Sequence, residues 1–142
     1  MTHQLNFIYN DSDWICPAEY PDLSKATEIA IDLETKDPNI KTKGPGWATF
    51  DGHIVGFAVA ALGQQWYFPI AHDAGGNMDL SITCAWMQDI LKLPATKIFH
   101  NASYDVGWLL VNGFEIKGKI VDTMIAAALI NENRFSFSLN AC

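Results

Sequence analysis

Two long apolar segments separated by a single glycine dominate the middle of this 142-residue chain. Residues 53–62 (HIVGFAVAAL) and 64–71 (QQWYFPIA) are rich in β-branched and aromatic side chains and meet at Gly63. This pattern predicts two antiparallel strands joined by a tight turn. With 49% apolar and 18% charged residues, the chain is able to bury a core, so we expect residues 1–142 to form a single compact domain.

The remaining segments predict an α/β protein. Further strands are expected at residues 5–10, 28–34 and 96–101. Helices are expected at residues 80–93, 102–113 and 122–133, and a loop at residues 36–52. In the first of these helices, which Pro94 ends, apolar residues recur at helical spacing: Ile82, Trp86, Ile90 and Leu93. Strands that lead the chain and then alternate with helices predict a mixed central sheet flanked by helices.

Composition excludes several classes of protein. A net charge of −7 argues against a broad basic face for nucleic acid, but not against a nuclease whose bound cations reverse a local acidic cluster. The apolar run at residues 54–62 is far shorter than the roughly 20 residues that span a membrane, so no membrane segment is expected. Three widely separated cysteines and the lack of a secretory signal predict reduced thiols and a cytoplasmic protein.

Two acids at the end of the predicted strand 28–34 suggest a cation site. Asp32 and Glu34 are two residues apart, so in a strand both side chains point to the same face. An isolated Asp-x-Glu is ordinarily a solvated strand end. Inside a sheet, however, two such acids repel each other and lose hydration, and a divalent cation such as Mg²⁺ relieves both costs. Thr35 adds a hydroxyl beside them.

A second acidic position follows the strand predicted at residues 96–101. Asn101 is expected at the start of the next helix, and Asp105 lies one turn along on the same helical face. The alternative is a purely structural role for both residues. Asn101 would then only cap the helix, and Asp105 would only be a favourable charge near the helix N-terminus. Combined with the first pair, Asp105 would bring a third carboxylate beside the central strand, as a two-metal phosphodiesterase site requires.

These motifs resemble a known family of nucleases. AIDLET (residues 30–35) and HNASYD (residues 100–105) resemble the first two motifs of the DEDD superfamily of 3′–5′ exonucleases. VGFAVA, QWYFPIAH and VDTMIAAALIN resemble the proofreading exonuclease domain of bacterial and phage family A DNA polymerases. The likeness runs from about residue 5 to residue 142, with the motifs in the family's order.

The resemblance implies an RNase H-like (DnaQ-like) fold and removal of nucleotides from single-stranded DNA 3′ ends with two Mg²⁺ or Mn²⁺ ions. It assigns the catalytic and metal-binding roles to Asp32, Glu34 and Asp105. It assigns substrate contacts to Thr35, Asn101 and Tyr104. Asp122 matches a further family aspartate, for which we expect a structural role as the cap of the helix that opens at Thr123. A bacterial cell or a phage-infected host is the implied setting.

The family's third motif, a Tyr or His four residues before a final Asp, does not follow Asp105. We therefore expect a C-terminally truncated exonuclease fold with an incomplete second metal site and weak or absent activity, unless His100 or Tyr104 substitutes. His72 is expected to support a turn. Trp47 and Phe50 are expected to cover the core edge rather than to stack on bases, although both roles fit their positions.

Two other functions fit the same residues. One is a ribonuclease of the RNase D type, which shares both motifs. The other is a non-catalytic module that binds single-stranded nucleic acid or a polymerase. The expected partners are DNA 3′ ends and a polymerase domain or replication protein, and apolar surface exposed by truncation would favour self-association.

Overall fold

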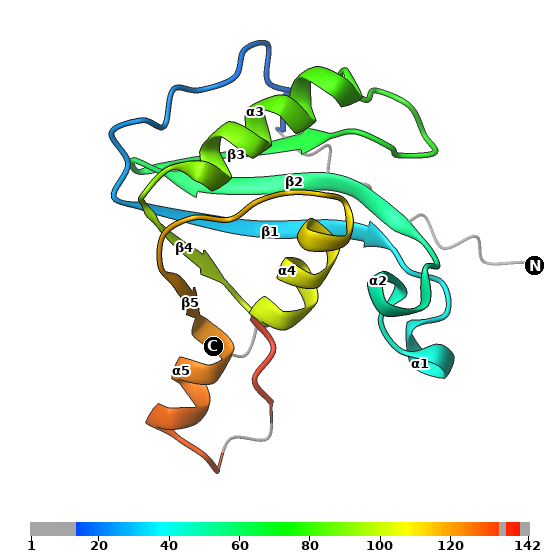
Figure 1. Cartoon of the computed structure of the whole chain (residues 1–142), viewed down its shortest axis with the longest axis vertical. Coiled ribbons are helices and arrows are strands. Elements are labelled where there is room, and N and C mark those ends of the chain that lie inside the picture. Colours follow the sequence, from blue (N-terminus) through cyan, green and yellow to red (C-terminus); the bar gives the residue numbers. More distant parts are fainter. Residues whose placement is uncertain (1–13, 134–135, 140–142) are drawn as a thin grey trace, which may run out of the picture.

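A mixed sheet forms the centre of the computed structural model, which describes residues 14–133 and 136–139 (Figure 1). In this part of the chain the strands lie in the order β3-β2-β1-β4-β5. Their bounds are Glu28–Lys36 (β1), His53–Ala61 (β2), Gln64–Pro69 (β3), Thr96–Phe99 (β4) and Ile120–Asp122 (β5). β1 is central, and it pairs antiparallel with β2 and parallel with β4. The predicted α/β class with a mixed sheet is confirmed, whereas the strand predicted at residues 5–10 lies outside the described residues.

The hairpin formed by β2 and β3 has the predicted tight turn. Leu62 and Gly63 connect the strands, and both have positive φ, 53° and 72°. A two-residue turn with both central residues in the left-handed region matches the right-handed twist of antiparallel strands. Glycine adopts this conformation without strain, whereas leucine does so at a cost.

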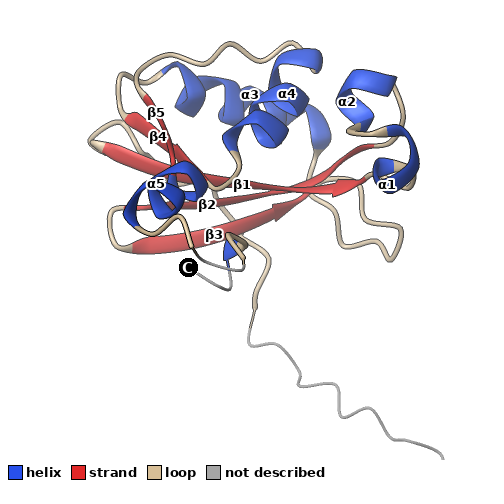
Figure 2. Ribbon diagram, turned by 90° about the horizontal axis from the view of Figure 1, so that it is seen from below, coloured by secondary structure: helices blue, strands red, loops and turns tan. Residues whose placement is uncertain are grey.

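Helices lie on both sides of the sheet, but they cover only one of its faces (Figure 2). α3 (Leu80–Lys92) and α4 (Ala102–Val111) lie on one face, and α5 (Thr123–Ile130) lies on the other. The segment predicted as a loop at residues 36–52 contains two single-turn helices, α1 (Ile40–Lys43) and α2 (Gly46–Thr49). No helix in the described ranges has the length and apolar character that crossing a membrane requires.

The core lies between the sheet and α3 and α4. Alternate residues of β1, namely Ile29, Ile31 and Leu33, are no more than 6% exposed and point toward these helices. The side chains of α3 that face them are Thr83, Met87, Ile90 and Leu91. The apolar spacing predicted that Ile82 would face the core, and this prediction was wrong, because Ile82 is 57% exposed.

Thr83 takes the buried position that the apolar pattern assigned to Ile82. Its hydroxyl donates to the Asp79 carbonyl at 2.7 Å and also bonds the Tyr20 hydroxyl at 2.7 Å. A buried hydroxyl with two partners loses little free energy on leaving water. Tyr20 lies far from Thr83 in the sequence. The spacing of apolar residues within α3 therefore could not indicate that Thr83, rather than Ile82, faces the core.

β4 contains a fully buried lysine, Lys97. Its Nζ donates to the carbonyls of Ala95 at 3.0 Å, of Lys117 at 2.6 Å, and of Leu93. These bonds join the end of α3, the start of β4 and the segment that precedes β5. Burial lowers the pKa of Lys97. The three-residue β5, which pairs with β4, was not predicted because so short a segment carries no periodic signal.

Candidate functional site

Asp32 and Glu34 lie on the face of β1 opposite Ile31 and Leu33, as the alternation of the strand predicts. Both side chains are exposed. Asp32 pairs with Ala58 of β2, and Glu34 pairs with Gly56, so small residues flank the two acids on that side. Although Asp32 is exposed overall, partial burial against the sheet raises its pKa, and the nearby His100 and the Leu33 backbone act in the opposite direction.

Asp105 approaches the same strand from its edge. The pairing of β1 with β4 ends at Ala30 opposite Ile98, which leaves the following residues of β1 open to α4. Asp105, in the first turn of α4, is 3% exposed. Burial and the charge of Asp32 raise the pKa of Asp105 to about 7, against a lowering by a backbone hydrogen bond from Leu33. The charge of Glu34 contributes a further increase.

The charges of Asp32 and Glu34 both act on Asp105, so the three acids lie in the same region of the molecule. Among the described residues, however, no three Asp, Glu, His or Cys side chains are gathered closely enough to hold a metal ion as they stand. The Oδ2 atom of Asp105 is buried and has no hydrogen-bond partner. A buried carboxylate oxygen without a partner, next to two further carboxylates, is a set of donors that suits a hard divalent cation.

Asp122, rather than Asn101, holds the N-terminus of α4. Asn101 occupies the predicted cap position in the left-handed conformation (φ 67°), but its side chain makes no cap hydrogen bond. Instead the Asp122 carboxylate accepts from the N–H groups of Asn101 at 3.0 Å and Ala102 at 2.8 Å. It also accepts from Met124 N–H at 2.9 Å and caps α5, as predicted. One carboxylate thus fixes the start of both helices and, through α4, the position of Asp105.

Thr35 and Tyr104 contact each other across the site. The Tyr104 hydroxyl donates to Asp37 Oδ2 at 2.9 Å, so the Thr35 hydroxyl, at 2.9 Å, donates to the Tyr104 oxygen. Asp37 also accepts from Gly46 N–H at 2.8 Å. This network ties α4 to the end of β1. Asp37 was missed in the sequence, where the only signal was a third acid shortly after Asp32 and Glu34.

A β-bulge helps to place Thr35 in this network. Glu34 pairs with Gly56, but the next residue, Thr35, pairs with Ile54, so Val55 is an extra residue in β2. Bulges of this kind turn a strand and redirect its side chains, often beside functional sites. Nothing in the sequence around Val55 distinguishes it from a regular strand residue.

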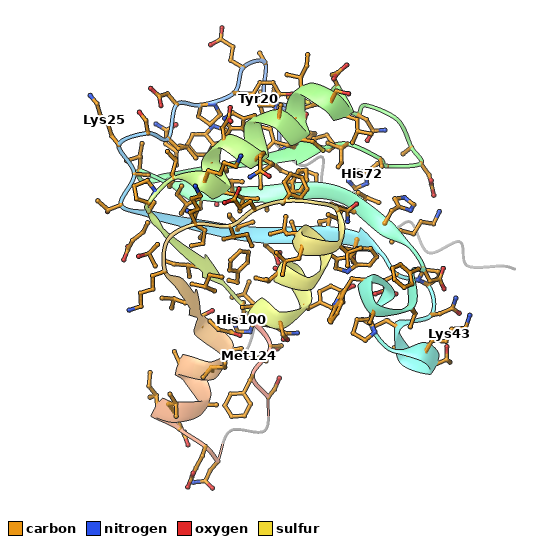
Figure 3. The ribbon with its side chains drawn as sticks, viewed as in Figure 1. Tyr20, Lys25, Lys43, His72, His100 and Met124 are labelled. Carbon is orange, nitrogen blue, oxygen red and sulfur yellow. The ribbon has the colours of Figure 1, made fainter. Side chains whose placement is uncertain are left out.

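His100 is committed to structural bonds (Figure 3). Its Nε2 donates to the Phe137 carbonyl at 2.6 Å, and its Nδ1 lies 2.9 Å from the Thr123 hydroxyl. Both ring nitrogens are therefore occupied, which disfavours His100 as a substitute for the third motif. The ring joins the start of α4 to α5 and to residues 136–139, and it lies beside Asp32.

Trp47 and Phe50 differ in their surroundings. Trp47 is partly buried and packs so closely on α4 that a Cβ atom at Gly107 would overlap its indole ring. It covers the edge of the core, as expected. Phe50 is 88% exposed and has a positive φ of 57°. Its side chain does not cover the core.

A cavity of about 520 Å³ lies on the open face of the sheet, and Asp32 is part of its lining. Asp32, His100 and Ile98 are among the residues that line it. Trp14 and Leu139, from the two ends of the described chain, also line it. The cavity is large enough for a nucleoside-sized group.

A family model described as a 3′–5′ exonuclease matches residues 20–141. The chain belongs to this 3′–5′ exonuclease family. The exonuclease domain is also 33% identical over 142 residues to a DNA-directed DNA polymerase of Pseudomonas phage M6. That match covers 95% of this chain and 21% of the phage protein, so the chain spans about a fifth of its relative. The resemblance to polymerase-linked exonucleases is confirmed.

Solved structures show the same fold. Brucella melitensis NrnC matches with a TM-score of 0.58 and 21% identity over 84% of this chain and 53% of NrnC. NrnC with bound Mg²⁺ gives a TM-score of 0.58 and 20% identity over 84% of this chain and 54% of NrnC. Escherichia coli RNase D matches with a TM-score of 0.52 and 21% identity over 77% of this chain and 25% of RNase D. The predicted RNase H-like fold is confirmed.

Proposed function

We propose that this exonuclease domain hydrolyses single-stranded DNA from the 3′ end, in a proofreading or replication setting, with Mg²⁺ or Mn²⁺ as cofactor. The observation that carries the proposal is the buried Asp105 carboxylate, which has an unpartnered oxygen and is electrostatically coupled to Asp32 and Glu34. Three acids kept this close in water alone repel one another, so the arrangement favours a cation.

Asp32, Glu34 and Asp105 are the residues that would hold the metal. Divalent ions bound there would activate the attacking water and stabilise the charge that develops on the phosphodiester. Asp105 is the most firmly placed of the three, because α4 is held at its start by Asp122 and at Tyr104 by Asp37. The Mg²⁺ bound to NrnC, a neighbour with the same fold, supports the choice of ion.

Thr35, Asn101 and Tyr104 are proposed to contact the terminal nucleotide. Asn101 suits this role because its amide is not used to cap α4. Thr35 and Tyr104 bond each other, so they would present one connected edge to the sugar and base. We expect weak activity from this chain, because three of the four carboxylates that the family resemblance implies are present.

A digestion assay tests the proposal. The purified chain is incubated with 5′-labelled single-stranded DNA and a matched RNA in millimolar Mn²⁺ or Mg²⁺, and products are resolved by length. The expected result is stepwise shortening of DNA that requires metal and is lost in Asp32→Ala and Asp105→Ala. Asp89→Ala, which changes an exposed acid on α3, is the matched control and should digest like the wild type. Digestion that persists in both Asp32→Ala and Asp105→Ala would refute the assignment.

Two alternatives have distinct outcomes in the same assay. Faster shortening of RNA than of DNA would favour a ribonuclease of the RNase D type, which the shared fold supports. Binding of the oligonucleotide without shortening, with metal bound, would favour a non-catalytic module that binds nucleic acid or a polymerase.

Partner contacts are proposed for the face that carries α5. No residue of α5 is buried, and Leu129 and Ile130 are 83% and 86% exposed. Apolar side chains gathered on one short helix favour contact with another polypeptide, either a polymerase domain, as the phage relative suggests, or a second copy of this chain. Sedimentation of the wild type and of Leu129→Asp would detect self-association. We also propose a cytoplasmic setting in a bacterial cell or phage-infected host.

A further inference from the structure

A tyrosine from β3 reaches across the sheet toward the acidic site. Asp32, Ala58 and Tyr67 form one row of paired residues across β1, β2 and β3. Directly paired residues on neighbouring strands place their side chains on the same face. The Tyr67 ring therefore lies on the same open face as the side chains of Asp32 and Glu34.

Gly56 makes room for the Tyr67 hydroxyl. Gly56 is the partner of Glu34 in β2, and a Cβ atom at this position would overlap the phenolic oxygen of Tyr67. The hydroxyl thus lies directly over the residue next to Glu34. Burial raises the pKa of Tyr67, and the negative charge of Glu34 raises it further, which agrees with this closeness.

His72, which lies just after β3 (Figure 3), holds the hydroxyl in this place. The His72 Nε2 atom hydrogen-bonds the Tyr67 hydroxyl, and the two rings meet edge to face with centroids 5.8 Å apart. The His72 backbone is fixed in turn by the Asn77 side chain, which accepts from its N–H at 2.7 Å and donates to its carbonyl at 2.9 Å. The Asn77 side chain and the His72 backbone thus hold this turn, whereas the His72 ring, which was predicted to support the turn, bonds Tyr67.

These contacts bring the Tyr67 hydroxyl to Gly56, the partner of Glu34, where the negative charge of Glu34 acts on it. A hydroxyl has one proton to donate and two lone pairs. If His72 donates from Nε2, the proton of Tyr67 is left for an acceptor on the open face, and the carboxylate of Glu34 is the acceptor beside Gly56. Groups that orient a ligating carboxylate in this way commonly control metal affinity without touching the metal.

We propose that Tyr67, held by His72 and accommodated by Gly56, is a positioning residue that donates a hydrogen bond to Glu34 and fixes this carboxylate for catalysis. The inference rests on the proposed function, because it assigns Glu34 to the site. Its structural alternative is that the Tyr67 and His72 pair only stabilises the loop after β3.

Metal affinity and turnover separate these two roles. The midpoint of Mn²⁺ binding to the folded domain is measured by isothermal titration calorimetry for the wild type, Tyr67→Phe, His72→Leu and His72→Gln. Tyr67→Phe and His72→Leu should raise this midpoint by about 10-fold or more, and lower kcat with little change in KM for the oligonucleotide. His72→Gln keeps a hydrogen-bonding group near the ring position and should retain most of the affinity.

Tyr20→Phe is the matched control. It removes a hydroxyl whose bond to Thr83, at 2.7 Å, lies on the helical face of the sheet away from the acids. It should lower stability without moving the Mn²⁺ midpoint. The double variant Tyr67→Phe, His72→Leu should match the single variants, because residues that act through one contact are not additive.

The outcomes distinguish this inference from the proposed function. If the wild type digests DNA but Tyr67→Phe has the Mn²⁺ midpoint and kcat of Tyr20→Phe, the positioning role is wrong and the exonuclease assignment stands. If the wild type binds Mn²⁺ without digesting DNA, the exonuclease proposal fails, and the midpoints still decide the role of Tyr67. A wild type that does not respond to Mn²⁺ overturns both.

Discussion

Replacing Asp105 by Asn should stabilise this domain at neutral and higher pH when no metal is present. Asp105 is 3% exposed, and burial together with the charges of Asp32 and Glu34 raises its pKa from the ordinary value of 3.8 to about 7. Asparagine has nearly the same shape and keeps an oxygen that can accept from Leu33. It has no charge to bury, so the repulsion from the neighbouring acids disappears.

The sign and size follow from the two pKa values. The pKa of Asp105 is higher in the folded state than in the unfolded state, so folding favours the protonated acid. The contribution of this protonated acid to the stability of the fold is complete below about pH 4. It is lost as the pH rises to about 7. At about 1.4 kcal/mol per pKa unit, the full loss is about 4 kcal/mol. The advantage of Asp105→Asn should therefore be about 2 kcal/mol near pH 5, and reach its limit above pH 7.

Urea unfolding in EDTA at pH 5, 6, 7 and 8 measures this difference in free energy of unfolding. Asp89→Asn, on the exposed surface of α3, is the control and should change stability by no more than about 0.5 kcal/mol at any pH. A difference between Asp105→Asn and the wild type that stays constant from pH 5 to pH 8 would show that Asp105 titrates normally. The site would then lack the electrostatic coupling on which the metal proposal depends.

Three further predictions concern the metal, the buried lysine and the hairpin turn. Saturating Mn²⁺ should raise the melting temperature by about 5 °C or more, and Asp32→Ala should abolish the rise in a thermal scan. Lys97→Met should lower the free energy of unfolding by about 3 kcal/mol in urea, because three carbonyls lose their donor; an unchanged midpoint would contradict the bonds of its Nζ. Leu62→Asn should raise stability by about 1 kcal/mol, since Leu62 has a φ of 53° and Asn-Gly suits this turn; a lower unfolding midpoint would count against it.

Local patterns were enough to predict much of the architecture. The two apolar runs around Gly63 became the β2 and β3 hairpin, and Pro94 and Gly113 mark the ends of α3 and α4. Asp122 caps α5, as its position before Thr123 suggested. These features depend on neighbours within a few residues, and backbone sterics and capping act over that range.

Features that depend on distant partners were not predictable. Thr83 is buried because Tyr20 bonds its hydroxyl, and Lys97 is buried because three carbonyls surround its amine. β5 is too short to show a pattern, and it exists because β4 offers an unpaired edge. The bulge at Val55 likewise appears only when β2 is paired with β1.

The candidate site divides along the same line. The sequence by itself determined which acids are present and that Asp32 and Glu34 share one face, because strand alternation is a local property. Only the tertiary structure decided that Asp105 enters from the strand edge with its pKa raised, that Asp122 holds α4, and that Tyr67 lies over Gly56. Burial and electrostatic coupling depend on which elements pack against one another. These tertiary contacts bring together residues that are far apart in the chain.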